Sequence, residues 1–277
     1  MTTLPLNQVF NLDIMALLRQ LPDNSVDCIF GDPDYNVGVK YNARSYTTSF
    51  DRYIEWYCEL ARECMRVLKD SGNAFFINYP KQNAYLRVRC LDEIAAHVNE
   101  YVWVYNTNVG HSKRKFTTAH RSILHATKTD DNAFYKDNVT KAYQNPTDRR
   151  IRDRIARGIK GRMPYSWFYF NLVKNVSHEK TVHTCQIPQK LSEMLISSCT
   201  IPGDNVLVLF GGSGAEVDVC MRLERNFIAA ELDPDYYQMI VDRISSGQID
   251  SKYKLDRALP GTIRKQNDEA VQLPLTV

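Results

Sequence analysis

The sequence lacks several features that would define its class. No apolar run approaches the roughly 18 residues of a transmembrane helix, and the first thirty residues lack the charged-then-apolar order of a secretory signal. There is no internal repeat and no low-complexity block. Hydrophobic residues make up 44% and charged residues 24% of 277 positions, close to the globular average. These features exclude a membrane, collagen-like or disordered chain. They predict a cytoplasmic protein of about one large domain, or of one domain with an insert.

The seven cysteines form no Cys-x-x-Cys pair, and their number is odd. Most of them stand inside apolar patterns, so we expect buried reduced thiols and neither disulfides nor a zinc site.

The net charge of +3 is only mildly basic and indicates little about binding partners. The distribution of the basic residues along the chain is more informative. The stretch 149–162, RRIRDRIARGIKGR, carries seven basic residues against one acid, Asp153. Such a cluster is either a solvated surface or a patch that binds phosphates, and the composition alone leaves both interpretations open.

Short apolar runs alternate with segments of helical spacing along most of the chain. The pattern predicts strands at 26–32, 72–79, 101–106, 122–127, 205–210 and 226–231. It predicts helices at 50–68, 86–98, 186–200, 214–224 and 234–245. Strands that alternate with helices favour an α/β fold with a doubly wound, mostly parallel sheet covered on both faces.

The α/β pattern breaks between residues 128 and 182, where the chain is polar, basic and aromatic without a clear period. We therefore predict a first core half at 1–127, an insert at 128–182, a second core half at 183–246 and a weakly packed tail at 247–277. The aromatic run 167–170, WFYF, is interpreted as the small core of the insert, and a platform on which bases stack is the alternative.

A glycine-rich loop follows the predicted strand 205–210. Gly211, Gly212 and Gly214 stand at the start of the next helix, where glycines allow close backbone approach and free N–H groups face a ligand. The following strand ends in Glu231, 17 residues beyond Gly214, near the spacing of a carboxylate that holds a ribose. A tight turn would explain the glycines alone. With the strands and the acid, and without a Gly-Lys-Ser/Thr sequence, they predict a site for a nucleoside cofactor that has no polyphosphate.

A second polar loop, Asp32-Pro33-Asp34-Tyr35, directly follows the predicted strand 26–32. Asp32 and the Pro33 carbonyl can accept the two hydrogens of an exocyclic amine, and Tyr35 can stack on the base that carries it. These two hydrogen bonds draw electron density onto the amine nitrogen. A plain β-turn is the alternative, because Asp-Pro-Asp also favours turns.

These two loops resemble the motifs of the β-group DNA amino-methyltransferases, which use S-adenosylmethionine. That family carries Asp-Pro-Pro-Tyr and Phe-x-Gly-x-Gly, matched here at 32–35 and 210–214 in the β-group order, with the target-recognition region between them. The segments LPDNSVDCIFGDPDYN (21–36), HTCQIP (183–188) and LERNFIAAELDPDYYQMIVDRI (223–244) are similar to further family segments. The resemblance covers roughly 8–128 and 178–246, and it leaves out the insert.

The resemblance implies the methyltransferase fold, with a catalytic half at 1–127, a target-recognition insert at 128–182 and a cofactor-binding half at 183–246. The catalytic residues that it implies are Asp32, Pro33 and Tyr35. The implied S-adenosylmethionine site consists of Asp13, Asp32, His183, Gln186, Phe210, Gly212, Ser213, Gly214 and Glu231. The candidate DNA contacts in the insert are Arg149, Arg150, Arg152, Arg154, Arg157, Lys160 and Arg162.

The chain departs from the family at Asp34, where the family has proline. We expect Asp34 to point to solvent. The alternative is that Asp34 shares a site with Asp32 and raises one of the two pKa values.

A second departure is Val208-Leu209, where the family has Asp-Pro and the Asp holds the methionine end of the cofactor. Glu216 or Asp218 are candidate substitutes, unless both are ordinary acids at a helix N-terminus.

The resemblance implies a sequence-specific methyltransferase that acts on a flipped base of double-stranded DNA. Asp at position 32 favours adenine N6. The alternatives are cytosine N4, an RNA substrate, or a catalytically impaired DNA-binding subunit of the same fold. A cognate restriction endonuclease and a homodimer are both compatible with the sequence, which decides neither.

Overall fold

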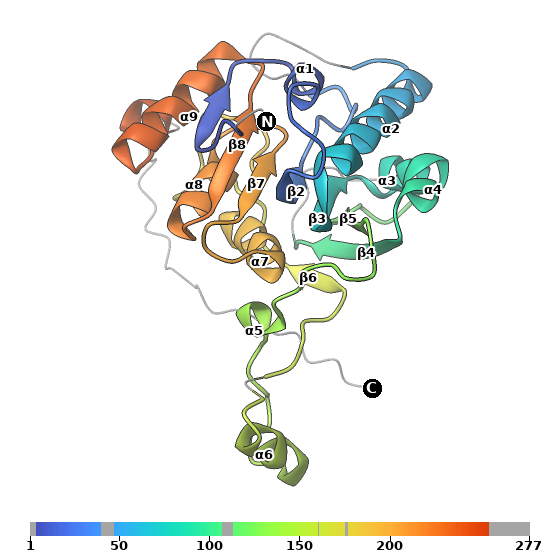
Figure 1. The fold of residues 1–277 in the computed structure, drawn as a ribbon, viewed down its shortest axis with the longest axis vertical. Helices are drawn as coiled ribbons and strands as arrows, with labels where there is room; N and C mark the ends of the chain where they lie inside the picture. The colour runs from blue at the N-terminus through green and yellow to red at the C-terminus, as the bar shows by residue number, and fades with distance from the viewer. Residues whose placement is uncertain (1–3, 40–46, 107–112, 160, 175–176, 255–277) are drawn as a thin grey trace.

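The computed structural model describes residues 4–39, 47–106, 113–159, 161–174 and 177–254, and it has an eight-stranded sheet at its centre (Figure 1). The strands are β1 (Gln8–Phe10), β2 (Val26–Gly31), β3 (Leu68–Asn78), β4 (His97–Val104), β5 (His120–Thr127), β6 (Trp167–Tyr169), β7 (Asn205–Val208) and β8 (Asn226–Ala230). Their order is β1-β8-β7-β2-β3-β5-β4-β6. Every neighbouring pair is parallel except the two that involve β5. The predicted mostly parallel α/β sheet is therefore confirmed.

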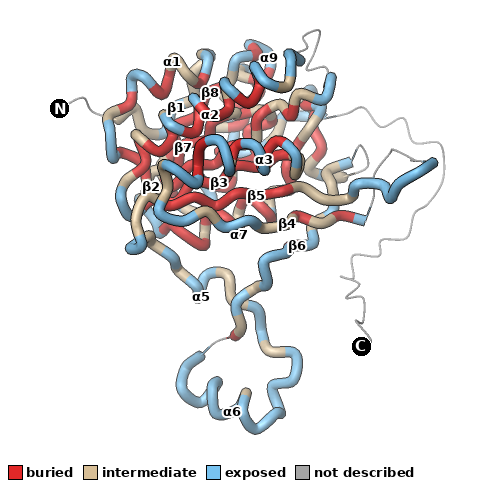
Figure 2. Tube along the Cα trace, turned by 90° about the vertical axis from the view of Figure 1, so that its right-hand side faces the viewer, coloured by how far each residue is buried: buried red, intermediate tan, exposed pale blue. Residues whose placement is uncertain are grey.

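Helices cover both faces of the sheet. The α-helices of the described residues are α1 (Ile14–Leu18), α2 (Phe50–Val67), α3 (Pro80–Leu86), α4 (Asp92–Ile94), α5 (Lys136–Val139), α6 (Arg149–Ala156), α7 (Gln189–Cys199), α8 (Ala215–Arg222) and α9 (Pro234–Ser246). Apolar side chains of α1, α2 and α3 pack on one face, and those of α7, α8 and α9 pack on the other. Leu207 contributes to the first core, whereas its neighbours Val206 and Val208 contribute to the second. This alternation explains why the strands β2, β3, β5, β7 and β8 are mostly buried (Figure 2).

The helix predicted at 86–98 is displaced in the structure. It begins earlier, at Pro80 in α3, continues through a π-helical turn at Arg87–Leu91, and ends with α4. Proline suits the first helical turn, where its missing N–H is not needed. The strand β4 then takes up residues from His97 onward that the periodicity had placed in the helix.

The aromatic run 167–170 is part of the main sheet, so its interpretation as a separate small core is wrong. Strand β6 pairs in parallel with β4, and Phe168 is buried in the same core as Trp103. The Trp103 indole N–H donates to the Phe170 carbonyl at 2.8 Å. Trp167 and Tyr169 alternate with Phe168 and are exposed. A strand at the edge of the sheet has one buried face, which explains this pattern.

The middle of the segment 128–182 extends away from the sheet (Figure 1). Helix α5 contacts the end of α7, where the Tyr135 N–H donates to the Ser198 carbonyl at 2.7 Å. Helix α6 lies at the tip of an arm, apart from the other elements (Figure 1). None of its residues is buried.

Strands β2, β3, β4, β7 and β8 run in the same direction, so their carboxyl ends meet at one edge of the sheet. The loops after β2, β7 and β8 therefore lie at this carboxyl edge, as does the connection between β4 and β5. Open α/β sheets bind ligands at such an edge. No helix in the described part of the chain is long and apolar enough to cross a membrane.

Candidate functional site

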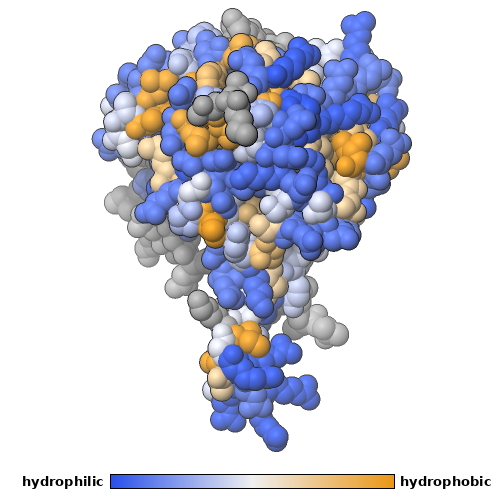
Figure 3. Space-filling model, viewed as in Figure 1, coloured by the Kyte–Doolittle hydropathy of each residue, from blue (hydrophilic) through white to orange (hydrophobic). Residues whose placement is uncertain are grey.

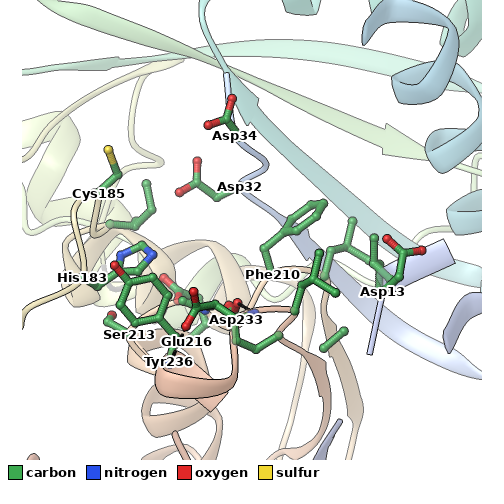
Figure 4. A pocket seen from close by; sticks show the side chains of 18 of the residues that line it. Asp13, Asp32, Asp34, His183, Cys185, Phe210, Ser213, Glu216, Asp233 and Tyr236 are labelled. Carbon is green, nitrogen blue, oxygen red and sulfur yellow. Dashed lines mark hydrogen bonds between the residues drawn. The ribbon is translucent and has the colours of Figure 1, made fainter. Parts of the chain in front are cut away.

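A cavity of about 350 Å³ opens at the carboxyl edge between the loops that follow β2 and β7. The two strands are neighbours, with Phe30 paired to Val208, so the two motifs that are far apart in sequence lie side by side. The cavity is lined by eight residues of the predicted site (Figure 4): Asp13, Asp32, His183, Gln186, Phe210, Gly212, Ser213 and Glu231. Pro33, Tyr35 and Gly214 are not part of its lining.

The glycine loop brings backbone close to the cavity wall. Gly212 has a φ of +52°, and a Cβ atom on it would lie 3.2 Å from the His183 ring. Gly214 has a φ of +71° and precedes α8 as its N-cap, so its role is to shape the turn. A side chain at either position would strain the backbone.

Glu231 anchors the loop at the end of β8. Its carboxylate accepts the Gly212 N–H at 2.7 Å and the Asp233 N–H at 2.8 Å, one on each oxygen. Burial raises the pKa of Glu231. A carboxylate has about four acceptor positions, so two remain for the hydroxyls of a ribose. Phe210 and Trp56, 6.2 Å apart between ring centroids, add aromatic surface to the cavity. This set of an acceptor pair, a glycine turn and aromatic rings fits a nucleoside.

Asp32 borders the cavity on the side of β2 and is otherwise surrounded by protein. Burial raises its pKa to about 7, and the charges of Glu216 and Asp34 act in the same direction. The Tyr35 hydroxyl, which donates to Asp32, opposes this rise, as does the Arg121 guanidinium. Asp32 therefore changes its charge near neutral pH.

The Tyr35 side chain is more enclosed than its motif suggests. Only 8% of it is exposed, and its ring meets the Tyr79 ring edge-on at 5.3 Å. The Arg121 guanidinium lies 3.8 Å from the Tyr79 ring centroid and 5.2 Å from that of Tyr35. Stacking of Tyr35 on a base stays a prediction. The contact of its hydroxyl with Asp32 is a feature that the sequence did not indicate.

Asp34 lines the cavity, so the expectation that it points to solvent is wrong. One carboxylate oxygen accepts the Asn36 N–H at 2.6 Å. The other is buried and has no hydrogen-bond partner among the described residues. Burial raises the pKa of Asp34, and its charge contributes to the raised pKa of Asp32, as expected for two carboxylates that share a site. Figure 4 shows the two side chains next to each other.

The structure separates the two acids of α8. Glu216 lines the cavity and accepts the Ser192 hydroxyl at 2.9 Å. Asp218 is not part of the lining, and it pairs with Arg243 at 3.2 Å and with Arg222 at 3.3 Å. Of the two candidate substitutes for the missing family Asp, only Glu216 faces the cavity.

Three other predicted cofactor residues shape the wall of the cavity. Burial lowers the pKa of His183 to about 4, so the ring is neutral, and it packs edge-on against Tyr236 at 4.6 Å. The Gln186 amide donates to the Glu179 carbonyl at 2.8 Å. Asp13 caps α1 by accepting the N–H of Met15 at 2.9 Å.

Some lining residues were not predicted from the sequence: Tyr53, Trp56, Asp233 and Tyr236. Each belongs to a helix or a helix cap whose pattern indicated only packing. Direct placement after a strand was the signal for Asp32, the glycine loop and Glu231, whereas the resemblance to the family supplied Asp13, His183 and Gln186.

The predicted DNA contacts do not join the cavity. Arg149, Arg150, Arg152, Arg154 and Arg157 are exposed on or directly after α6, at the largely hydrophilic tip of the molecule (Figure 3). Arg162 is partly buried and lies over the Tyr165 ring at 4.6 Å, and Lys160 lies outside the described residues. A second basic segment, 113–116 (KRKF), is exposed on the connection between β4 and β5 at the carboxyl edge, with Phe116 99% exposed.

Comparisons with known proteins agree with this geometry. Residues 26–242 match a family model described as DNA methylase. The type II methyltransferase M.BglII of Bacillus subtilis is 31% identical over 258 residues, which cover 88% of this chain and 70% of that protein. The DNA adenine methyltransferase YhdJ of Escherichia coli K12 is 27% identical, over 84% of this chain and 80% of that protein.

Two solved structures share the fold. One is a PvuII DNA methyltransferase described as cytosine-N4-specific, with a TM-score of 0.64 and 19% identity over 87% of this chain and 93% of that one. The other is M1.HpyAVI in complex with S-adenosylmethionine, with a TM-score of 0.56 and 21% identity over 85% of this chain and 98% of that one.

Proposed function

The chain belongs to the N6/N4 family of DNA methylases, and from this premise we propose that it transfers a methyl group from S-adenosylmethionine to adenine N6 in a specific DNA sequence. One observation carries the proposal. The glycine loop after β7 and the Asp32 loop after β2 open into the same cavity, so a nucleoside cofactor and an amine acceptor would meet there.

The cofactor assignment rests on the lining of the cavity. Glu231 would hold the ribose, Phe210 and Trp56 would contact the adenosine, and Gly212 adds backbone without a side chain to the lining. Bound there, S-adenosylmethionine supplies an electrophilic methyl group. One neighbour of this fold is described as a complex with it.

The loop 32–35 would bind the base whose amine accepts the methyl group. A base must leave the duplex to reach a cavity at the edge of the sheet. Ionised Asp32 would accept one hydrogen of its amine and the Pro33 carbonyl the other. The Asp32 carboxylate has acceptor positions for both the amine and the Tyr35 hydroxyl. Hydrogen bonds aimed at the charge that develops on the amine are typically the largest catalytic contribution.

Adenine N6 is favoured by Asp at position 32 and by the relative that is described as an adenine methyltransferase. Cytosine N4 is the second candidate, because the PvuII neighbour is described as cytosine-N4-specific.

The DNA path that we propose has two parts. Segment 113–116 lies at the carboxyl edge and would contact DNA beside the flipped base. Segment 128–182 would act as the target-recognition insert between the catalytic half (1–127) and the cofactor-binding half (183–246), with the exposed arginines of α6 at phosphates. Type II relatives make a cognate endonuclease a further candidate partner.

Methyl transfer from labelled S-adenosylmethionine to mixed duplex DNA tests the proposal. Nucleosides from the digested product should contain labelled N6-methyladenine. Labelled N4-methylcytosine would instead identify cytosine N4 as the target. Absence of incorporation with intact DNA binding would instead identify a binding subunit.

Asp32→Ala is the matching variant for this assay. It should lower the rate at least about 100-fold, since a charge-assisted contact made in the transition state is lost, and DNA binding should persist. Glu193→Gln, at an acid of α7 that is 41% exposed and outside the lining of the cavity, is the control and should remain active.

A further inference from the structure

The cavity has an unusual balance of charge. Its lining includes six carboxylic acids, and no lysine or arginine is among the described lining residues: Asp13, Asp32, Asp34, Glu216, Glu231 and Asp233. The only histidine of the lining, His183, has a pKa lowered to about 4 by burial and is neutral. A cavity of this kind suits a cationic ligand.

The acids differ in how they are already engaged. Asp13 and Asp233 cap α1 and α9 by accepting backbone N–H groups, and Glu231 accepts two more. Asp32 accepts the Tyr35 hydroxyl. Glu216 is engaged by one neutral side chain, Ser192.

Glu216 is buried without a cation. It is 6% exposed, and none of the ion pairs between described residues includes it. Arg243 is the cation that acts on it electrostatically, yet that guanidinium is bound to Asp218 at 3.2 Å and to the Ser213 carbonyl at 3.1 Å. Burial raises the pKa of Glu216 to about 7. Buried charges are normally paired, so a cation in the cavity would offset the free energy of burying this carboxylate.

The position of Glu216 indicates which part of a ligand it would meet. It stands in the first turn of α8, directly after the glycine loop that Glu231 binds through the Gly212 N–H, and its charge helps to raise the pKa of Asp32. A cofactor whose ribose lies at Glu231 and whose methyl group faces Asp32 would bring its positive charge near Glu216.

We propose that Glu216 binds the positively charged methionine end of the cofactor, its ammonium or sulfonium group, an inference that rests on the proposed function. Val208, buried in the core on the α7 side, cannot serve this purpose. In the resembled family, an Asp at the position of Val208 holds the methionine end of the cofactor, and in this chain Glu216 would hold it instead.

Three related ligands distinguish the contributions of the ammonium, the sulfonium and the adenosine to binding. S-adenosylmethionine carries both cationic groups, S-adenosylhomocysteine keeps only the ammonium, and 5′-methylthioadenosine has the adenosine with neither. Their affinities are measured by calorimetry on the wild type, Glu216→Gln, Glu231→Gln and Glu193→Gln. The last variant is the matched control, because it makes the same change of charge at an acid of the neighbouring helix α7 that is 41% exposed and outside the lining.

Glu216→Gln should weaken S-adenosylmethionine about 10- to 100-fold and leave 5′-methylthioadenosine within about 2-fold, because only the charge contact is lost. A parallel loss for S-adenosylhomocysteine would assign the ammonium, and no loss would assign the sulfonium. Glu231→Gln should weaken all three ligands, and Glu193→Gln should weaken none.

Unchanged S-adenosylmethionine binding by Glu216→Gln, or an equal loss for 5′-methylthioadenosine, would overturn the assignment. If the Gln variant binds nothing, Glu216→Asp, which keeps the charge one methylene shorter, must recover S-adenosylmethionine over 5′-methylthioadenosine, and failure to do so counts against the proposal. A wild-type protein that binds none of the three ligands would refute the proposed cofactor itself.

Discussion

Removal of the Tyr35 hydroxyl should shift the pH at which methyl transfer begins and leave the activity at alkaline pH intact. The hydroxyl donates to Asp32, which must be ionised to accept a hydrogen of the target amine. Burial raises the pKa of Asp32 to about 7, and the hydrogen bond from Tyr35 holds it below the value that burial alone would produce. Tyr35→Phe removes that hydrogen bond and keeps the ring.

The size of the shift follows from the strength of the contact. A hydrogen bond to a charged group contributes about 1.5–3 kcal/mol, and about 1.4 kcal/mol corresponds to one pKa unit. The pKa of Asp32 should therefore rise by about one to two units in the variant. Because the active form is the ionised one, the rise of activity moves to higher pH. At pH 7 the ionised fraction should fall from about half to between about 1% and 10%.

The assay is the pH profile of kcat/KM between pH 5.5 and 9.5, which reports the ionisation of the free enzyme. Tyr85→Phe, at an exposed tyrosine of α3, is the control and should keep the wild-type midpoint. An unchanged midpoint in Tyr35→Phe would show that the hydroxyl does not stabilise ionised Asp32. Loss of activity at every pH would show that the hydroxyl has another role.

Three further predictions concern the cofactor loop and the arm. Glu231→Ala should weaken S-adenosylmethionine about 10- to 100-fold by calorimetry, because contacts to the ribose are lost; equal affinity would place the ribose elsewhere. Gly212→Val should bind the cofactor less well still, because its φ of +52° strains a β-branched residue and a Cβ would lie only 3.2 Å from the His183 ring; a variant with normal affinity would contradict this geometry. Each exposed arginine of α6 that meets a phosphate should, as alanine, flatten the plot of log affinity against log salt by about 0.9. Slopes identical to the wild type in all these variants would show that the DNA does not contact the arginines of α6.

Local signals in the sequence were sufficient for the unit from β7 to α9. A continuous apolar run predicts a buried strand, glycines directly after it predict a tight approach of backbone, and Glu231 ends the next apolar run. The same holds for β2 and the loop that begins at Asp32. Each of these signals lies within a few residues, so no knowledge of distant contacts is needed. The pairing of the two loops at one cavity follows from the parallel sheet, because the carboxyl ends of neighbouring strands meet.

Other features depend on partners that lie far away in the sequence. The residues of β5 do not determine its direction relative to β3, because a strand with two buried faces fits either orientation. The run 167–170 alternates in exposure only because β4 offers it an edge. Asp34 faces the cavity because Tyr53 holds its carbonyl at 2.7 Å and Asn36 its side chain, contacts that no motif predicts.

Glu216 and Asp218 show the same division within a single helix. Both acids stand in the first turns of α8, and the sequence made them equivalent candidates. Two positions along an α-helix turn a side chain by about 200°, so only one of the two can face the cavity. The packing of α8 against α7 and α9 selects Glu216 and leaves Asp218 to Arg243. The sequence by itself determined that a carboxylate was available here, and the tertiary structure decided which one, because the rotation of a helix about its axis is set by the surfaces on which it packs.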